Sequence, residues 1–173
     1  MQVIAVVGTK KSGKTTTIEN LVKELTKRGH KLAVIKHISK PDFTIDTAGK
    51  DTWKFARAGA KTIISVAATE IAKIEKIQFK KISLEKLLQR CEECELVIIE
   101  GLKKLVGTKE NIPKIVVTKS IQEVKNAVES FKPILAFSGP YNSSNFNLKI
   151  PYANGSVNPQ KLADIVESSL KKE

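Results

Sequence analysis

The stretch that decides the fold is VIAVVGTKKSGKT, which runs from Val3 to Thr15. Its apolar first part, Val3–Val7, predicts a buried strand, and its second part, Gly8–Thr15, matches the pattern G-x-x-x-x-G-K-[ST]. An amphipathic segment, Thr15–Arg28, follows directly and predicts a helix. A glycine-containing loop between a strand and a helix directs its backbone N–H groups inward, and the helix dipole adds partial positive charge. The stretch therefore predicts a phosphate-binding loop.

Two side chains of this loop have distinct expected roles. Lys14 would reach the β- and γ-phosphates of a nucleoside triphosphate, and the hydroxyl of Thr15 would bind Mg²⁺. The remaining predicted phosphate contacts lie in the loop or just after it and are Gly8, Lys10, Lys11, Ser12, Gly13 and Thr16. A glycine-bearing turn that binds nothing is the alternative, and the strand–loop–helix context disfavours it.

A candidate metal ligand and catalytic residue follows another buried strand. Glu100 ends the apolar run Leu96–Ile99 and precedes Gly101, which is the layout of a Walker B strand. Acidic residues at the carboxyl ends of strands in an open α/β sheet are placed to hold Mg²⁺ and to position water. A strand-end acid that only caps a loop is the alternative for Glu100.

A further carboxylate lies in a segment with the spacing of a nucleotide switch loop. Asp46 begins a D-x-x-G pattern that ends at Gly49. In switch loops this spacing brings a carboxylate toward the metal and a backbone N–H toward the γ-phosphate. Lys50 and Asp51 extend the pattern into a polar patch. We therefore predict Asp46 as the other metal ligand and catalytic residue, with Gly49 beside the γ-phosphate.

Further apolar runs alternate with helix-like segments along the chain. The other predicted strands lie at Leu32–Ile35, Thr62–Ala67, Leu96–Ile99, Lys114–Thr118 and Pro133–Phe137. The other predicted helices lie at Thr52–Ala58, Ser83–Glu92, Ile121–Ser130 and from Pro159 onward, with Ser83 and Asn158 as N-caps. This alternation predicts the α/β class, a three-layer P-loop NTPase fold with a mostly parallel sheet flanked by helices. Residues Glu70–Lys81 predict a small antiparallel extension, and the chain length fits a single nucleotide-binding domain over residues 1–173.

Composition limits the class of protein. The hydrophobic fraction of 41% is that of a globular protein, and no apolar run approaches the roughly 18 residues that span a bilayer, so we expect no membrane association. The chain begins with a strand-like segment rather than a basic leader, which predicts a cytoplasmic protein. The formal charge of +12 suits phosphorylated ligands, acidic proteins or nucleic acid, although a lysine-rich surface is also typical of proteins from hot-living organisms.

Four blocks of the sequence occur in an order that is typical of one family. They are Gly8–Thr16, Ile35–His37, Phe43–Thr52 with Ala58–Ala60, and Val97–Lys103. On these blocks, which lie within residues 1–104, the chain resembles the MobB family of accessory proteins in molybdopterin-guanine dinucleotide biosynthesis. The resemblance implies binding of GTP with Mg²⁺, slow hydrolysis at most, a homodimer, and assistance to the molybdopterin guanylyltransferase that joins GMP to molybdopterin. It also implies that His37, Lys50 and Asp51 line the nucleotide cleft, although His37 could instead only cap its strand.

The choice of guanine comes from the resemblance. The N-K-x-D pattern with which regulatory GTPases read guanine is absent from the sequence. The nearest segment is Thr118–Ser120 after a predicted strand, and Phe137–Pro140 ends another. Both segments could contact a base, but we favour ordinary strand-to-helix connections for both.

Two other function classes compete with a GTP-binding accessory protein. A small P-loop nucleoside or nucleotide kinase is the alternative enzyme, but such kinases usually have several arginines at the acceptor site, and Arg28, Arg57 and Arg90 are scattered here. A nucleic-acid binder would use the positive charge, but the aromatic fraction is only 5% and basic and aromatic residues do not interleave. We therefore expect no nucleic-acid partner.

A cysteine pair offers one more hypothesis. Cys91 and Cys94 have the C-x-x-C spacing of a redox pair or of half a zinc site. Two copies of the pair across a dimer axis could complete a tetrahedral site. Inert packing near a helix end is the simpler interpretation.

Overall fold

The computed structural model describes residues 1–78, 82–142 and 149–170. These residues form two compact units, which we call the sheet unit (residues 1–37 and the described residues from 88 onward) and the hairpin unit (the described part of residues 38–87). This division reflects how residues pack against one another within the chain, and it does not test whether the chain folds as one domain. The expectation of one folding domain over residues 1–173 therefore stays a prediction.

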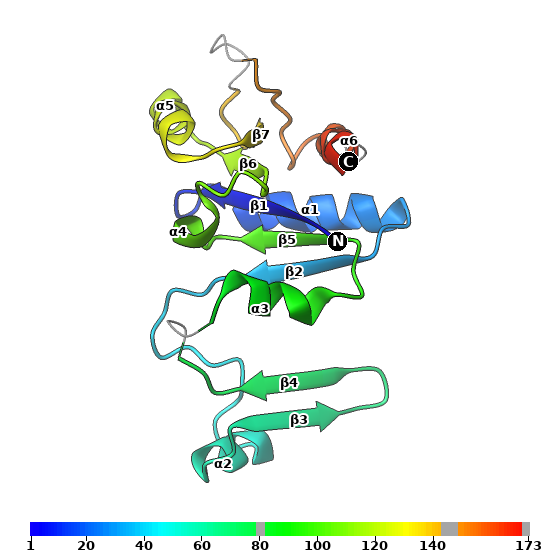
Figure 1. The fold of residues 1–173 in the computed structure, drawn as a ribbon, viewed down its shortest axis with the longest axis vertical. Helices are drawn as coiled ribbons and strands as arrows, with labels where there is room; N and C mark the ends of the chain where they lie inside the picture. The colour runs from blue at the N-terminus through cyan, green and yellow to red at the C-terminus, as the bar shows by residue number, and fades with distance from the viewer. Residues whose placement is uncertain (79–81, 143–148, 171–173) are drawn as a thin grey trace. The chain divides into compact units, whose positions relative to one another are not determined.

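The sheet unit is built on five parallel strands in the order β2-β5-β1-β6-β7 (Figure 1). Their bounds are β1 Gln2–Gly8, β2 Leu32–Lys36, β5 Leu96–Glu100, β6 Lys114–Val117 and β7 Ile134–Ser138. Residues Ile4–Val7 and Leu96–Ile99 in the two adjacent strands β1 and β5 are all buried. An uninterrupted apolar run suits a parallel strand, because helices cover both faces of a parallel sheet. The predicted, mostly parallel sheet is confirmed.

Helices cover both faces of this sheet. They are α1 Lys14–Lys27, α4 Lys103–Val106, α5 Ile121–Ser130 and α6 Pro159–Leu170, with a 3₁₀ turn at Gln89–Cys91. On one face Leu21 of α1 and Leu162 of α6 share a buried cluster with Ile115 of β6. The next residue, Val116, faces the other side and borders α4 and α5. The three-layer arrangement is confirmed, and no helix in the described ranges is long and apolar enough to cross a membrane.

The hairpin unit holds a small antiparallel sheet. Its elements are α2 Asp51–Arg57, β3 Thr62–Val66, β4 Ile71–Glu75 and, at its end, all but the last residue of α3 Leu84–Leu88. The strands pair from Thr62 opposite Glu75 to Val66 opposite Ile71. The predicted antiparallel extension is thus confirmed for β4, while residues 79–81 of the predicted segment lie outside the described residues.

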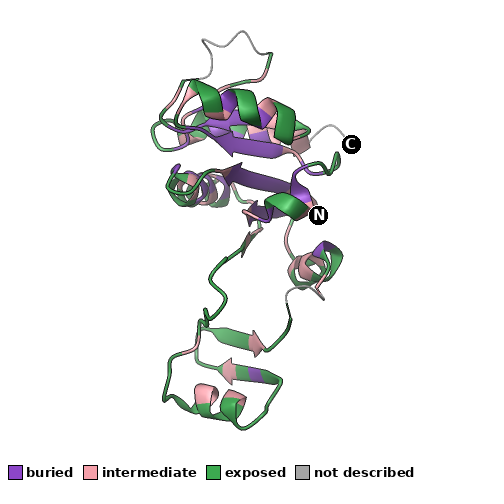
Figure 2. Ribbon diagram, turned by 90° about the vertical axis from the view of Figure 1, so that its left-hand side faces the viewer, coloured by how far each residue is buried: buried purple, intermediate pink, exposed green. Residues whose placement is uncertain are grey.

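One predicted strand lies outside the parallel sheet. The run Thr62–Ala67 does form a strand, but it pairs in this hairpin and not in the parallel sheet. A strand inside a parallel sheet is buried on both faces. In β3 only Ile63 is buried, whereas Ile64 and Val66 are exposed (Figure 2). An apolar run alone does not distinguish a doubly covered strand from a strand with one open face.

Candidate functional site

The loop between β1 and α1 comes close to neighbouring backbone, and that approach requires glycine. A Cβ atom on Gly8 would lie 2.4 Å from the carbonyl oxygen of Val117 and 2.8 Å from Oγ of Ser12. Gly13 has a φ of +95° and open space around it. The hydroxyl of Ser12 is buried and has no hydrogen-bond partner among the described residues. A loop with left-handed residues and an unsatisfied inner hydroxyl suits an anion, which accepts hydrogen bonds from both.

The other predicted phosphate contacts surround the same loop. Lys10 and Lys11 are exposed on it, and Lys11 has a φ of +60°, which is unusual for a residue with a side chain. Thr16 lies exposed in the first turn of α1, where helix N–H groups lack intrahelical partners. The structure thus brings all the predicted loop residues to one helix N-terminus.

Lys14 begins α1 and reaches across the loop. Its Nζ donates a hydrogen bond to the backbone oxygen of Thr9 at 2.6 Å. Burial lowers the pKa of Lys14, Glu100 opposes this change, and three neighbouring lysines lower it further, with Lys103 first among them. Because these cations repel one another, an anion bound among them would be stabilised and would favour the charged form of Lys14.

Strand register gathers three side chains beside the loop. Lys36 ends β2 directly opposite Glu100, which ends β5. The hydroxyl of Thr15 donates to Oε1 of Glu100 at 3.1 Å, and Nζ of Lys36 lies 3.2 Å from Oε2 of Glu100 and 3.5 Å from the Thr15 oxygen. The side chain of Glu100 is only 12% exposed, whereas that of Lys36 is 49% exposed, so water reaches the cluster from the Lys36 side. Two residues predicted from separate motifs therefore meet, and Lys36 joins them.

The donor set of this cluster is of the kind that Mg²⁺ prefers. Hydroxyl and carboxylate oxygens are hard ligands, and Thr15 and Glu100 supply one of each. The ammonium group of Lys36 contacts both, so the point between them already stabilises a positive charge. A magnesium ion would find oxygen ligands here, and Lys36 would compete with it.

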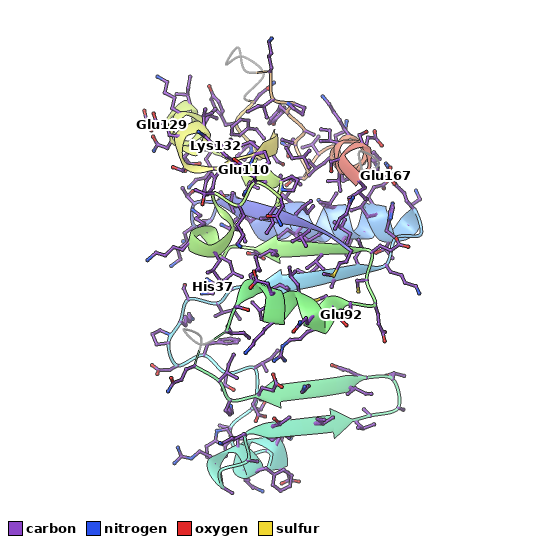
Figure 3. All side chains as sticks on the ribbon, in the orientation of Figure 1. His37, Glu92, Glu110, Glu129, Lys132 and Glu167 are labelled. Atoms are coloured by element: carbon purple, nitrogen blue, oxygen red, sulfur yellow. The ribbon has the colours of Figure 1, made fainter. Side chains whose placement is uncertain are left out.

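His37 lies next to this cluster at the carboxyl end of β2 (Figure 3). Its backbone N–H donates to the oxygen of Glu100 at 3.0 Å. A Cβ atom on Gly101 would lie 3.3 Å from Cβ of His37, so the glycine lets the two strand ends approach. The structure therefore places His37 beside Glu100.

The switch-like residues belong to the hairpin unit. Oδ1 of Asp46 accepts hydrogen bonds from Oγ1 of Thr52 at 2.7 Å and from the N–H of Thr47 at 3.0 Å, so this carboxylate holds the start of α2. Oδ2 of Asp46 is buried and has no partner within the described ranges. Gly49 has a φ of +86°, Lys50 precedes α2, and Asp51 pairs with Lys54 in its first turn. Their approach to the Gly8–Thr15 loop, and the metal and catalytic roles of Asp46, stay predictions.

A residue that sequence reasoning missed ties the loop to the end of β6. Oε1 of Glu123 accepts a hydrogen bond from Oγ1 of Thr9 at 2.8 Å, and Oε2 accepts one from the N–H of Lys119 at 2.7 Å. Ser120 caps α5, accepting from the N–H of Glu123 at 3.3 Å. The pattern S-x-x-E, here Ser120 to Glu123, is a helix-start signal that could have drawn attention to this glutamate.

The cysteine pair has the features of structural thiols. Cys91 and Cys94 are both partly buried, and neither forms a disulfide among the described residues. Burial raises the pKa of Cys91, which disfavours the reactive thiolate. Among the described residues no three histidine, cysteine or acidic side chains are grouped to hold a metal. A zinc site completed by a second copy of the chain stays a hypothesis, as does inert packing.

Comparisons with known proteins identify relatives of this chain. A family model described as MobB, molybdopterin guanine dinucleotide synthesis protein B, matches residues 3–138. The molybdopterin-guanine dinucleotide biosynthesis adapter protein of Haemophilus influenzae is 33% identical over 171 residues, which cover 96% of this chain and 88% of that protein. A protein of Methanocaldococcus jannaschii is 42% identical over 121 residues, which cover 69% of this chain and only 48% of that protein. The chain therefore spans about half the length of this second relative.

A solved structure agrees with the fold. The structure of Bacillus subtilis MobB superimposes with a TM-score of 0.77 over 100% of both chains, at 23% identity. At this identity the likeness concerns the fold alone. Because the family model matches most of the chain and the Haemophilus influenzae relative aligns over nearly all of it, the chain belongs to the MobB family.

Proposed function

We propose that this protein is a GTP-binding adapter in molybdopterin-guanine dinucleotide biosynthesis, which binds GTP with Mg²⁺ and assists a molybdopterin guanylyltransferase. The observation that carries the proposal is the meeting of Lys14, Thr15 and Glu100 at the N-terminus of α1. Family membership supports the biosynthetic role, since the Haemophilus influenzae relative is named as an adapter of that process.

Each group has a definite part in this proposal. Mg²⁺, when bound, neutralises charge on the β- and γ-phosphates. Thr15 and Glu100 would hold it, and Lys14 would leave the backbone oxygen of Thr9 to contact the phosphates. Lys36 would move away from Glu100 as the metal enters, so binding exchanges one cation for another. Asp46 is the proposed third ligand and, with Glu100, would orient water.

We propose that hydrolysis is slow. An arginine that stabilises the transferring group accelerates such reactions greatly. Arg28 lies at the C-terminal end of α1, away from the loop at its N-terminus. It pairs with Glu24 at 2.9 Å and with Asp164 and Glu167 at 2.7 Å each. Arg57 stacks on Trp53 within the hairpin unit. Both arginines already have structural partners, which also disfavours the kinase alternative.

The hairpin unit offers a surface for the proposed homodimer. Residues alternate between the two faces of β3 and β4, so Ile64, Val66 and Ile71 share one face. Their exposed fractions are 58%, 75% and 70%. The opposite face carries Ile63, which is buried. Contiguous exposed apolar residues mark interaction surfaces, and a second copy of the chain would cover this face.

A titration tests the nucleotide proposal. The purified protein is titrated with GTP and with ATP, each with and without Mg²⁺, as the wild type, as Lys14→Ala and as the control Lys27→Ala at the exposed end of α1. We expect preference for GTP, dependence on Mg²⁺, and loss of about tenfold or more in affinity only for Lys14→Ala. Preference for ATP with transfer of phosphate to a small acceptor would replace the adapter by the kinase.

A further inference from the structure

A cavity of about 380 Å³ opens beside the phosphate loop, within the sheet unit. It lies between α4, α5 and the end of β6, and Gly8 and Thr9 form its border with the loop. Its volume falls within the range of about 300–1,000 Å³ typical of small-molecule sites. Gly8 is also a predicted phosphate contact, but the nucleotide proposal depends chiefly on Lys14 and on the strand end at Glu100, and neither of these residues lines the cavity. The cavity therefore needs an explanation of its own.

The cavity has an apolar floor and a cationic rim. Val116, Ala127 and the ring of Phe131 supply apolar surface, and the first two of these are buried. Lys103 and Lys104 of α4 line the cavity and are exposed, so they stand at its mouth. Apolar walls with a few placed charged groups select a ligand that is apolar at one end and anionic at the other.

The aromatic wall already attracts positive charge. Nζ of Lys103 lies 6.0 Å from the centre of the Phe131 ring. A ring in this position also offers its face to a planar heteroaromatic molecule, and the ammonium group would then lie beside that molecule. The wall thus favours a flat ring over a branched aliphatic chain.

The rim connects the cavity to the phosphate site. Lys103 contributes to the lowered pKa of Lys14, so the two ammonium groups share one region of positive potential. Glu123 lines the cavity and is already bonded to Thr9 and to the N–H of Lys119. Because its carboxylate is engaged, it opposes a bound anion less than a free carboxylate would.

We propose that this cavity binds a planar heteroaromatic molecule that carries a phosphate, with the ring against Phe131 and the phosphate at Lys103 and Lys104. The nucleotide and this second ligand would then lie on either side of Gly8 and Thr9. The choice of a phosphorylated pterin within this class rests on the proposed function, since the family is named for a molybdopterin product. The broader class, a planar heteroaromatic molecule with a phosphate, is inferred from the residues that line the cavity.

The test uses the intrinsic fluorescence of pterins. The probes are 6-hydroxymethylpterin phosphate, the same pterin without phosphate, and inorganic phosphate as a competitor, each added to the full chain with and without GTP and Mg²⁺. The variants are Phe131→Leu, the double variant Lys103→Gln with Lys104→Gln, and the control Lys125→Gln on α5, which does not line the cavity. NMR of backbone amides maps the contact independently of the variants.

The proposal expects saturable binding of the phosphorylated pterin. Affinity should fall about tenfold in Phe131→Leu and about tenfold or more in the double lysine variant, while Lys125→Gln matches the wild type. Amide shifts should include Asn126 and Ala127 of the cavity wall. No binding, or binding that inorganic phosphate abolishes at equal concentration and that leaves these amides unmoved, would overturn it. GTP titrations in the same samples separate this result from the nucleotide proposal.

Discussion

The carboxyl ends of the parallel strands and the β3–β4 hairpin differ in how the chain covers them. Glu100 follows four fully buried residues and meets Thr15 and Lys36 at fixed distances. The hairpin has one face with the buried Ile63 and another face on which Ile64, Val66 and Ile71 are exposed. Rigid, doubly covered strands position chemistry precisely, whereas an uncovered apolar face is suited to meeting another molecule. The cavity and the cluster at Glu100 therefore belong to the sheet unit, whereas the proposed dimer surface belongs to the hairpin unit.

The largest expected effect tests how tightly the sheet unit is packed at its loop. Gly8→Ala would place a Cβ atom 2.4 Å from the carbonyl oxygen of Val117, which backbone movement must relieve. We expect a loss of about 3 kcal/mol in the free energy of unfolding and no detectable GTP binding. Gly59→Ala in the hairpin unit is the matched change, because φ there is +110° but nothing lies within 4 Å. It should cost only about 1 kcal/mol. Equal losses measured by chemical denaturation would remove the contrast.

The second prediction concerns the open face of the hairpin. Val66→Lys adds a charge where the side chain is 75% exposed, so the monomer should lose less than about 0.5 kcal/mol. If this face joins two copies, the dimer dissociation constant should rise about thirtyfold, as for removal of an interface anchor. Sedimentation equilibrium measures it, with Lys23→Gln, an exposed lysine on α1 of the sheet unit, as the control. A dimer of unchanged strength would move the interface elsewhere.

The third prediction concerns the ammonium group of Lys36 at the carboxyl ends of β2 and β5. Lys36→Gln removes the ammonium group that contacts Glu100 and Thr15, so Mg²⁺ would no longer displace it. We expect the affinity for Mg²⁺, in the presence of GTP, to rise about fivefold, which corresponds to about 1 kcal/mol. Calorimetric titration of Mg²⁺ measures it, and Lys23→Gln, an exposed lysine paired with Glu19, is the control. Weaker Mg²⁺ binding would mean that Lys36 helps to hold the nucleotide instead.

Local patterns predicted the part of the site that is contiguous in sequence. The strand, loop and helix from Val3 to Arg28 could be predicted from the sequence. Their hydrophobic periodicity, the spacing of the loop glycines and the position of the loop between strand and helix all agree. Glu100 was found because a buried strand leads into it. The cap of α6 was also correct, since Oδ1 of Asn158 accepts from the N–H of Lys161 at 3.1 Å.

Contacts between distant segments could not be predicted in the same way. Lys36 matters only because β2 lies beside β5, and no local signal reveals that neighbour. Lys114 is fully buried in β6, with its ammonium group bonded to the backbone oxygens of Lys109 and Lys132, whereas a lysine in a sequence is normally read as exposed. The same limit explains why the sequence did not reveal that Thr62–Val66 pairs outside the parallel sheet. Pairing is a property of the whole chain, so it appears only in the structure.

The smallest effect is expected where the end of α1 meets α6 within the sheet unit, a contact that we call the seam. After α1, Nε2 of His30 lies 2.9 Å from the carboxylate of Glu167 on α6, and Nδ1 lies 3.3 Å from that of Glu95. The hydrogen bond with Glu167 raises the pKa of His30, burial opposes this change, and Glu95 adds to it. Arg28 also lies at this seam, where it bonds Glu167 as well as Glu24 and Asp164.

Because the pKa of His30 is raised on folding, protonated His30 stabilises the folded state most below its unfolded pKa of about 6.5, and this contribution disappears as pH rises through the folded value. His30→Gln should therefore cost up to about 1 kcal/mol at pH 6 and almost nothing at pH 9. The lowered pKa of Glu167 acts in the acid range, below about pH 4.5, and so leaves this window unaffected. Urea denaturation at several pH values measures the difference, with Lys23→Gln as the control. If the free-energy cost of His30→Gln does not change with pH, His30 stabilises the fold by packing, and its charge contributes nothing.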